Sequence, residues 1–246
     1  MSFFIYNLKG KNPYYNIAFE EYLFTEHDKF DQDIYLVFYE NSEAVILGKN
    51  LVKDQETYTH KKLPPVIRRC SGGGSVVHFK GNLNFGLILN TKEYSQFSMI
   101  TTSYEKILNC VSKSLNSKFI IKHDGISDLC IEEKYGSRKI SGNSQARKKN
   151  WLLHHGTILY DVKNINKISK FLRHPPKEPD YRKGRPHKDF LITYLPYTTR
   201  SVLAQKLTKG FAVEFDKTPC MRNVTSDLEI SSRQYLNKIL SQKFRC

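Results

Sequence analysis

Three consecutive glycines separate two stretches that have the pattern of β-strands, and this arrangement constrains the fold strongly. Residues 68–78 read Arg-Arg-Cys-Ser-Gly-Gly-Gly-Ser-Val-Val-His. Because glycine loses more chain entropy on folding than other residues, a loop that keeps three of them needs their small size or their backbone freedom. One such need is the close approach of a ligand to backbone N–H groups, which form an anion-binding nest. Arg68 and Arg69 add forked donors for a phosphate or a carboxylate.

Other interpretations of this stretch are open or excluded on its pattern. A flexible turn is typical of a bare run of glycines, but the arginine pair before it and the strand after it favour a binding loop. It is not a Walker A loop, because no Gly-Lys-Ser/Thr follows. It does not fit the dinucleotide-binding fingerprint either, because it opens a strand rather than a helix.

The N-terminal half of the chain is predicted to alternate between a helix and short strands. Apolar residues at spacings of three and four after Pro13 predict a helix over 14–27. Polar segments at 40–43 and 80–82 predict two hairpins between the strands that flank them. The apolar runs predict strands at 34–39, 44–47, 66–69, 75–79 and 83–89.

The C-terminal half completes an α+β pattern. Helical spacing over four turns predicts a helix at 100–115, and further helices are expected around 202–207, ended by Gly210, and at 228–240. Residues 173–189 hold four prolines and many charges, which predicts a long loop, and loops of this length are usually either functional or disordered. Strands are predicted at 128–133, 138–141 and 151–160. The fold class expected is α+β, a mostly antiparallel or mixed sheet with helices packed against it, in one domain over 1–246.

A second stretch, Arg-Lys-Ile-Ser-Gly-Asn-Ser-Gln at 138–145, places a lysine beside a glycine. In a strand, Lys139 and Ser141 lie on one face, whereas Arg138 and Ile140 lie on the other. A lysine in this position suits contact with a phosphate or carboxylate as a compact point charge. Taken alone, any lysine is more often an ordinary solvated side chain.

Two adjacent histidines form the third stretch, Leu-His-His-Gly-Thr at 153–157. Neighbours in a strand face opposite ways, so His154 and His155 cannot chelate one metal together. No other cluster with metal-ligand spacing is present, and we expect no structural metal. One histidine is expected to pack in the core and the other to line a pocket.

The charge of the chain limits its partners. It carries 39 Lys and Arg against 24 Asp and Glu, a net charge of +15. Such an excess is typical of proteins that bind nucleic acid, an anionic membrane or an acidic protein. The basic residues are spread along the chain, however, and no nucleic-acid-binding signature is present. The longest strongly apolar run, 34–39, is far shorter than the roughly 18 residues of a membrane span. We therefore expect no membrane partner.

Cysteine usage and the N-terminus indicate the compartment. The cysteines are odd in number and widely spaced, which predicts neither a disulfide framework nor a zinc pair: Cys70, Cys110, Cys130, Cys220 and Cys246. The first residues lack the pattern of a secretory signal. We expect a reducing compartment, the cytoplasm, with an organelle matrix also open.

Together, the three stretches resemble the lipoate–protein ligase family, whose relatives are biotin–protein ligases and octanoyl transferases. The family pattern is Arg-Arg-x-Ser-Gly-Gly-Gly-Ala-Val-x-His then Gly-Asn, followed by Lys-Ile-Ser-Gly-Ser/Asn-Ala-Gln and His-His-Gly-Thr-Leu-Leu. The resemblance covers at least 13–161. The chain departs from the pattern at Ser75 and Ser144, where the family usually has alanine. The residues after 161 are too few for the small C-terminal accessory domain of larger members, so we expect none.

The resemblance implies ATP-dependent joining of lipoate, or octanoate, to a lysine of an acceptor protein. The acceptor would be a lipoyl domain of a 2-oxoacid dehydrogenase or a glycine-cleavage H protein, and Mg²⁺ would accompany ATP. It also implies an apolar tunnel for the acyl chain and a helper role for Asp128. Lys139 would be catalytic and would contact both substrates, and lipoate would further contact His155 and Gly156. ATP and the lipoyl-adenylate would bind at Arg69, Ser71, Gly72, Gly73, Gly74, Ser75, Val76, Val77, His78, Asn82 and Lys139.

Two other functions stay open at this point. An octanoyl transferase of the same superfamily would use a cysteine nucleophile and no ATP. In single-domain bacterial transferases that cysteine precedes the acidic residue and leucine ahead of the lysine motif, whereas residues 119–124 here contain none. A nucleic-acid-binding protein, suggested by the charge alone, is the second alternative. We expect instead that the positive charge steers an acidic acceptor domain toward the enzyme.

Overall fold

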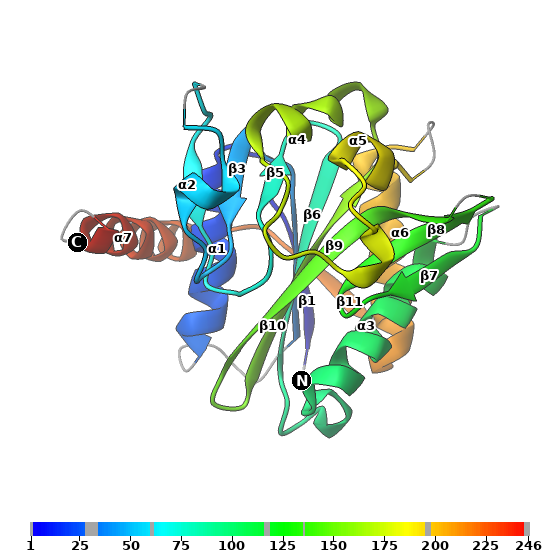
Figure 1. Ribbon diagram of the computed structural model, residues 1–246. Helices are drawn as coiled ribbons and strands as arrows, with labels where there is room; N and C mark the ends of the chain where they lie inside the picture. The colour runs from blue at the N-terminus through cyan, green and yellow to red at the C-terminus, as the bar shows by residue number, and fades with distance from the viewer. Residues whose placement is uncertain are drawn as a thin grey trace.

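The computed structural model describes residues 2–27, 34–59, 62–115, 119–134, 136–194 and 198–243 (Figure 1). Short 3-10 turns lie at Ser95–Phe97, Val162–Asn164 and Asp180–Arg182. The helices and strands follow in this order: β1 (Phe3–Asn7), α1 (Pro13–Thr25), β2 (Ile34–Tyr39), β3 (Ala44–Leu47), α2 (Lys53–Glu56), β4 (Val66–Arg68), β5 (Val76–His78), β6 (Asn82–Asn90), α3 (Ile100–Leu115), β7 (Ile121–Asp124), β8 (Asp128–Glu133), β9 (Gly136–Lys148), β10 (Trp151–Leu159), α4 (Asn166–Phe171), α5 (His187–Phe190), α6 (Arg200–Phe215), β11 (Pro219–Arg222) and α7 (Ser226–Lys243).

In the described part of the chain, two sheets organise these elements. The large sheet is eight-stranded in the order β11-β1-β2-β6-β10-β9-β8-β7, and the small sheet has the order β4-β3-β5. Strand β1 pairs in parallel with β2 and β11, whereas the other pairs of the large sheet are antiparallel. The expected α+β class with a mixed sheet and packed helices is confirmed.

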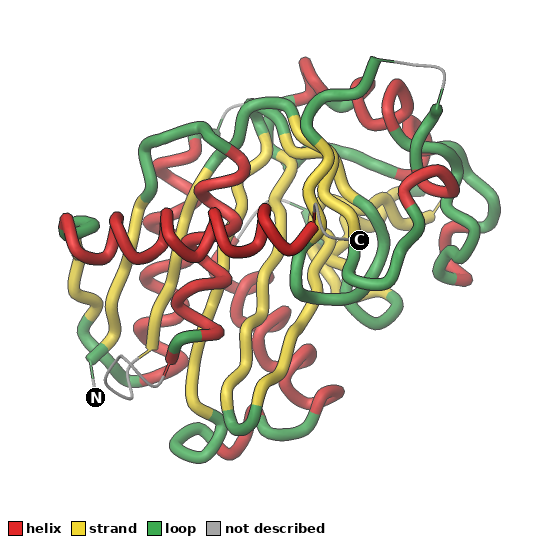
Figure 2. Tube along the Cα trace, turned by 90° about the vertical axis from the view of Figure 1, so that its left-hand side faces the viewer, coloured by secondary structure: helices red, strands yellow, loops and turns green. Residues whose placement is uncertain are grey.

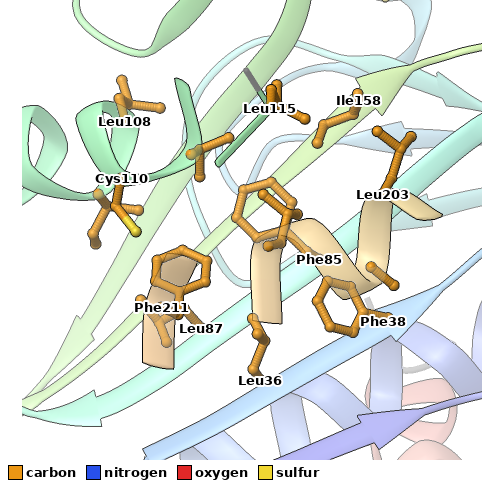
Figure 3. Packing of buried hydrophobic residues seen from close by; sticks show 14 of the residues in the cluster. Leu36, Phe38, Phe85, Leu87, Leu108, Cys110, Leu115, Ile158, Leu203 and Phe211 are labelled. Carbon is orange, nitrogen blue, oxygen red and sulfur yellow. The ribbon is translucent and has the colours of Figure 1, made fainter. Parts of the chain in front are cut away.

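Helices cover both faces of the large sheet. Alternate residues of β2 show this, because Ile34, Leu36 and Phe38 pack in the cluster of α3 and α6, whereas Tyr35 and Val37 pack against α1. Figure 3 shows the first cluster, in which Phe85 and Leu87 from β6 meet Phe211 of α6. Figure 2 shows α7 lying across the outer side of α1, which explains why α1 is buried nearly all round.

The two predicted hairpins are wrong. Strands β2 and β6 belong to the large sheet, whereas β3 and β5 pair with each other in the small one. The segments 40–43 and 79–81 therefore carry the chain between sheets. The side chain of Glu40 links these two connecting segments, because its Oε2 accepts the N–H of Gly81 at 3.1 Å. Turn-type residues signal a change of direction, but they do not select the pairing partner.

The predicted end of a helix at Gly210 is also wrong, since α6 continues to Phe215. A Cβ on Gly210 would lie 1.7 Å from Oγ of Ser114 on α3. The glycine therefore permits close packing of two helices, and its smallness outweighs its low helix propensity. The helix ends at Asp216, which adopts a left-handed conformation with φ 49°.

Several elements lack a sequence prediction. Strands β1, β7 and β11 and the short helices α2 and α4 were not expected, and α5 begins inside the segment predicted as a loop. Strand β11 is short and its side chains are mostly exposed, so it has little apolar pattern. It is held by pairing with β1, a contact between opposite ends of the chain.

Candidate active site

Two adjoining cavities, of about 660 and about 120 Å³, lie beside the small sheet and the inner strands of the large one. Strand β9 and the glycine loop contribute to both. The larger cavity is also lined by the proline-rich segment 173–191, here called the strap. Figure 1 shows α4, which precedes the strap, and α5, which lies within it, above β5 and β9. The residues common to both cavities are Gly74, Ser75, Val76, Ser127, Asp128, Lys139, Gly142 and Thr157.

An ion pair stands where the cavities meet. Nζ of Lys139 on β9 lies 2.9 Å from Oδ1 of Asp128 on β8, and their side chains are 23% and 9% exposed. A Cβ on Gly142 would lie 2.8 Å from Nζ of Lys139, so the glycine leaves the space that the lysine occupies. Lys139 and Ser141 line the larger cavity, as expected for one face of this strand. Ile140 packs in the core but also contributes to the wall of that cavity, so the predicted division into two faces is incomplete.

The strap reaches this ion pair through Tyr181, which the sequence analysis did not single out. Its hydroxyl donates to Oδ2 of Asp128 at 2.6 Å. Burial and the Asp128 carboxylate raise the pKa of Tyr181 far above its ordinary value, which keeps the phenol protonated as a donor. The thiol of Cys130 in turn donates to the Tyr181 oxygen at 3.5 Å.

Arginines fasten the strap to β9. Arg138 donates to the carbonyl of Leu191 at 2.7 Å, and Arg185 donates to the carbonyls of Ser137 and Tyr181, each at 2.9 Å. The Arg182 guanidinium lies 4.7 Å from the centre of the Phe190 ring. The proline-rich segment thus has a defined conformation and lines the larger cavity, while a functional role for it stays a prediction.

The arginine pair shapes the glycine loop from inside. Nη2 of Arg69 donates to the carbonyls of Gly72 and Gly74 at 2.5 and 2.8 Å. Arg68 donates to the carbonyls of Gly48 and Leu51 at 2.9 and 2.7 Å. Burial lowers the pKa of Arg69 to about 10, which still leaves it charged at neutral pH. These guanidinium groups donate to backbone carbonyls and, from Nε of Arg69, to Oγ of Ser71, while their expected contact with a bound anion stays a prediction.

The N–H groups of the loop point elsewhere. Within the described residues, the backbone N–H groups of Gly72, Gly73, Gly74 and Ser75 donate no hydrogen bond. Gly73 has φ +80°, a conformation that favours glycine. Oγ of Ser75 is buried without a partner. Four successive N–H groups without an acceptor among the described residues are available for the predicted nest, whose binding of an anion stays a prediction.

The two histidines lie on opposite sides of the sheet, as predicted. His154 is fully buried and packs against Phe85 and Tyr104, and burial lowers its pKa to about 3. His155 lines the smaller cavity, where its Nδ1 donates to Oε1 of Glu20 at 2.5 Å. Its Nε2 lies 2.6 Å from Oγ of Ser71.

The structure sorts the predicted residues between the cavities. Val77 and Asn82 line only the larger one, whereas Gly74, Ser75, Val76 and Lys139 line both. Arg69, Gly73 and His78, which were expected at ATP and the lipoyl-adenylate, line only the smaller one, together with His155 and Gly156. Ser71 and Gly72 line neither cavity and act on the site through hydrogen bonds to His155, Arg69 and Ser144.

The wall of the smaller cavity differs from the expected apolar tunnel of Phe, Leu and Ile side chains. Its aliphatic residues are Ile17, Ile46 and Val76. The remainder is glycine backbone and polar side chains, several of them fully buried. The chain is rich in Phe, Leu and Ile, but these large side chains pack mainly in the cores on either side of the large sheet.

A protein-built metal site is absent from the described residues, since no three His, Cys, Asp or Glu side chains are grouped to hold an ion. Carboxylates do line the larger cavity, among them Asp124, Asp128 and Asp180. This donor set fits Mg²⁺ that arrives with phosphates and keeps its water ligands. Among the helices described, none is long and apolar enough to cross a membrane.

Residues 12–215 match the family model of the lipoyl protein ligase A/B catalytic domain. The chain belongs to this family. A probable lipoate-protein ligase A from Mycoplasma pneumoniae is 34% identical over 168 residues, which are 65% of this chain and 46% of that relative. The chain spans about half the length of the curated relatives it matches.

Solved structures share the fold. One is the bi-partite lipoate protein ligase of Thermoplasma acidophilum, described with its E2 lipoyl domain. It has a TM-score of 0.78 and 22% identity, over 96% of this chain and 92% of that one. Another is a lipoate-protein ligase A bound with ATP, with a TM-score of 0.72 and 22% identity over 97% and 95% of the two chains.

Proposed function

We propose that this chain is a lipoate–protein ligase that activates lipoate or octanoate with ATP and transfers the acyl group to a lysine of an acceptor protein. One observation carries the proposal: two cavities of different size and chemistry meet at a single lysine, Lys139. A reaction that joins an acyl carboxylate to a nucleotide phosphate needs two such cavities and one cation between them. The A/B family supplies the class of substrate.

The nucleotide is assigned to the larger cavity and the acyl chain to the smaller. In the first step a carboxylate oxygen attacks the α-phosphorus of ATP, and pyrophosphate leaves. Lys139 stands at the junction to offset the negative charge of both reactants, and the free N–H groups of Gly74 and Ser75 face developing phosphate charge. The carboxylates of Asp124, Asp128 and Asp180 in the larger cavity would help to hold Mg²⁺, which would supply further neutralisation of phosphate charge. In the second step the acceptor's amine attacks the acyl carbonyl, and AMP leaves.

The acceptor is proposed to be a lipoyl domain or a glycine-cleavage H protein. The Thermoplasma relative is described with an E2 lipoyl domain, which supports this class of partner. A net charge of +15 favours encounter with an acidic domain. We further propose a cytoplasmic location, supported by the free state of Cys70, Cys110, Cys130 and Cys220, whereas Cys246 lies outside the described residues.

We also propose a single catalytic domain over 1–246. The family model ends at 215, but β11 follows it and pairs with β1, and α7 packs on α1. Residues beyond the match thus complete the same sheet and the same helical layer.

The transferase alternative needs a reactive cysteine, and the described cysteines do not suit that role. Cys70, Cys110, Cys130 and Cys220 line neither cavity. Burial raises the pKa of both Cys110 and Cys130 to about 12, so both are thiols at neutral pH. A variant in which all the cysteines become Ala or Ser is expected to keep its activity. Acyl thioester on Cys130, and loss of turnover in Cys130→Ser, would indicate the transferase.

The deciding experiment is ATP–pyrophosphate exchange with lipoate or octanoate in the absence of any acceptor. The ligase exchanges labelled pyrophosphate into ATP only when an acid is present. Failure to exchange with either acid, in protein that is folded by circular dichroism, would overturn the proposal. Tight binding of duplex DNA or RNA at physiological salt would favour the nucleic-acid alternative instead.

A further inference from the structure

The smaller cavity crosses the large sheet from one strand to another, and this gives it two distinct ends. Tyr39 on β2 pairs with Asn84 on β6, Asn84 pairs with Thr157 on β10, and Gly156 pairs with Asn143 on β9. All five line the cavity. Because neighbouring strands are about 4.8 Å apart, the path from β2 to β9 is about 14 Å. With C–C bonds of about 1.5 Å, an extended chain of eight carbons fits within it.

Lys139 marks one end of this path, and His78 marks the other. The His78 ring lies 6.3 Å from the ring of Tyr39, centre to centre, at the β2 side. If the carboxylate of an acyl substrate lies at Lys139, the far end of its chain lies near His78. This placement rests on the proposed function.

A chain of hydrogen bonds fixes the proton of the His78 ring. Nδ2 of Asn16 donates to the carbonyl of Gly10 at 2.8 Å, which identifies that atom as the amide nitrogen. Its second hydrogen goes to Oδ1 of Asn41 at 2.8 Å, so Nδ2 of Asn41 is the donor toward Nδ1 of His78 at 2.9 Å. Nδ1 is therefore an acceptor, and the ring carries its hydrogen on Nε2.

The Nε2–H group of His78 is left without a partner. No described residue accepts from it, although the side chain is only 4% exposed and lines the cavity. Burial and the Arg69 charge lower the pKa of His78 to about 3, so the ring is neutral and this donor is its single N–H. An apolar chain end placed here would leave the donor buried and unsatisfied, a loss comparable to that of a hydrogen bond.

A free acceptor lies in the same wall. Nδ2 of Asn84 donates to the carbonyls of Tyr39 and Asn82, each at 3.3 Å, so its amide orientation is also fixed. Oδ1 of Asn84 is buried with no partner. The far end of the cavity thus presents polar atoms to whatever occupies it.

We propose that His78 determines acyl specificity, because its fixed Nε2–H donates to a heteroatom near the far end of the acyl chain and so favours a sulfur-bearing acid over a plain fatty acid. The sulfur atoms of a dithiolane are weak acceptors of such a hydrogen bond. A site built to satisfy a buried polar group discriminates against an analogue that cannot do so. Asn16 and Asn41 act as positioning residues, since they hold the ring with its donor toward the cavity.

The test compares three acids as substrates for ATP–pyrophosphate exchange: lipoate, octanoate, and 6-thiaoctanoate, in which one methylene is replaced by sulfur. We expect kcat/KM for 6-thiaoctanoate to exceed that for octanoate by about three- to tenfold, the effect of one hydrogen bond. Equal values for the two would overturn this inference and leave the proposed function intact. No exchange with any acid would overturn the proposed function.

Two variants of equal side-chain length provide the matched control. His78→Gln keeps an N–H donor at the cavity, whereas His78→Met has none. The higher kcat/KM for 6-thiaoctanoate than for octanoate should persist in His78→Gln and disappear in His78→Met. In His78→Met the difference should disappear mostly because kcat/KM for octanoate rises. A preference that is the same in both variants contradicts the assignment. If His78→Met does not fold, the comparison of 6-thiaoctanoate with octanoate on the unaltered protein still tests the proposal.

The position of the ring proton has its own measurement. In protein labelled with ¹⁵N histidine, the His78 ring should show a protonated Nε2 and an unprotonated Nδ1 throughout pH 5–8. Addition of lipoate should shift the Nε2 signal more than octanoate does. A proton on Nδ1 would remove the donor from the cavity and overturn the proposal.

Discussion

Nζ of Lys139 and Oδ1 of Asp128 lie 2.9 Å apart at the junction of the two cavities. The ammonium group of Lys139 thus forms a partly buried ion pair with Asp128. In the proposed reaction it also contacts the substrate carboxylate or phosphate. Asp128 keeps a further partner, because its other oxygen accepts from Tyr181. This arrangement holds the cation in place before any substrate anion arrives, which limits the reorganisation needed in the reaction.

Removal of the cation should stop activation and spare the fold. In Lys139→Ala, we expect ATP–pyrophosphate exchange to fall by about 100-fold or more, which is typical of the loss of one preorganised charge contact. Lys122→Ala is the matched control, because Lys122 is a 40% exposed lysine on the adjacent hairpin, lines neither cavity, and pairs with Glu132. Near-normal exchange by folded Lys139→Ala would exclude this lysine from the chemistry.

A methyl group at Gly142 should have a similar effect by displacing the lysine. Its Cβ would lie 2.8 Å from both Cε and Nζ of Lys139, and the end of a flexible side chain can move away. The Gly142→Ala protein is therefore expected to fold, with thermal unfolding close to that of the parent, while exchange falls at least tenfold. Gly10→Ala, where the added methyl meets nothing within 4 Å, should be neutral. Equal effects of the two substitutions would contradict the role given to Gly142.

The fold could be predicted from the sequence where the pattern is local. The periodicity of α3, the continuous apolar run of β2 and the opposite faces of His154 and His155 follow from helix and strand geometry alone. The partners of β3 and β5 do not, because pairing depends on which sheet a strand enters after a crossing. Gly210 shows the same limit, since its neighbour Ser114 lies on another helix.

The site shows a similar division. The motifs pointed to Lys139 and the glycine loop as site residues. Lys139, Gly73 and Gly74 line the cavities, while their roles in binding and catalysis stay predictions. The motifs did not reveal that Nη2 of Arg69 donates to the carbonyls of Gly72 and Gly74 in its own loop. Tyr181 was missed because nothing in a proline-rich segment indicates which side chain turns inward. Its position depends on the contacts of Arg185 and Phe190, which only the folded chain brings together.

The link between the strap and the lysine gives a prediction for Tyr181. Tyr181→Phe removes one hydrogen bond to a carboxylate, which is worth roughly 1.5–3 kcal/mol. We expect kcat for exchange to fall about tenfold while KM for the acid changes little, because the strap does not line the smaller cavity. Steady-state kinetics with each substrate varied separate the two constants. Tyr235→Phe, on α7, is the control, because Tyr235 lines neither cavity. A change in the KM for the acid alone would argue against positioning of Lys139.

Two buried histidines should make the fold sensitive to acid. Burial lowers the pKa of both His78 and His154 to about 3, below the ordinary value of 6.5. Between those values the unfolded chain binds protons that the folded chain does not, so the stability is fully present above pH 6.5 and is lost as the pH falls toward 3. Urea unfolding followed by circular dichroism from pH 7 to pH 4 should show this decline in the free energy of unfolding.

The variant His154→Asn isolates one of the two histidines. It keeps an amide in place of the Nδ1 atom near Gln145. The slope of the free energy of unfolding against pH should fall by about one proton, even if the variant is less stable at pH 7. An unchanged slope would mean that His154 is already protonated in the folded protein, which its burial among Phe85, Tyr104 and Asn143 opposes.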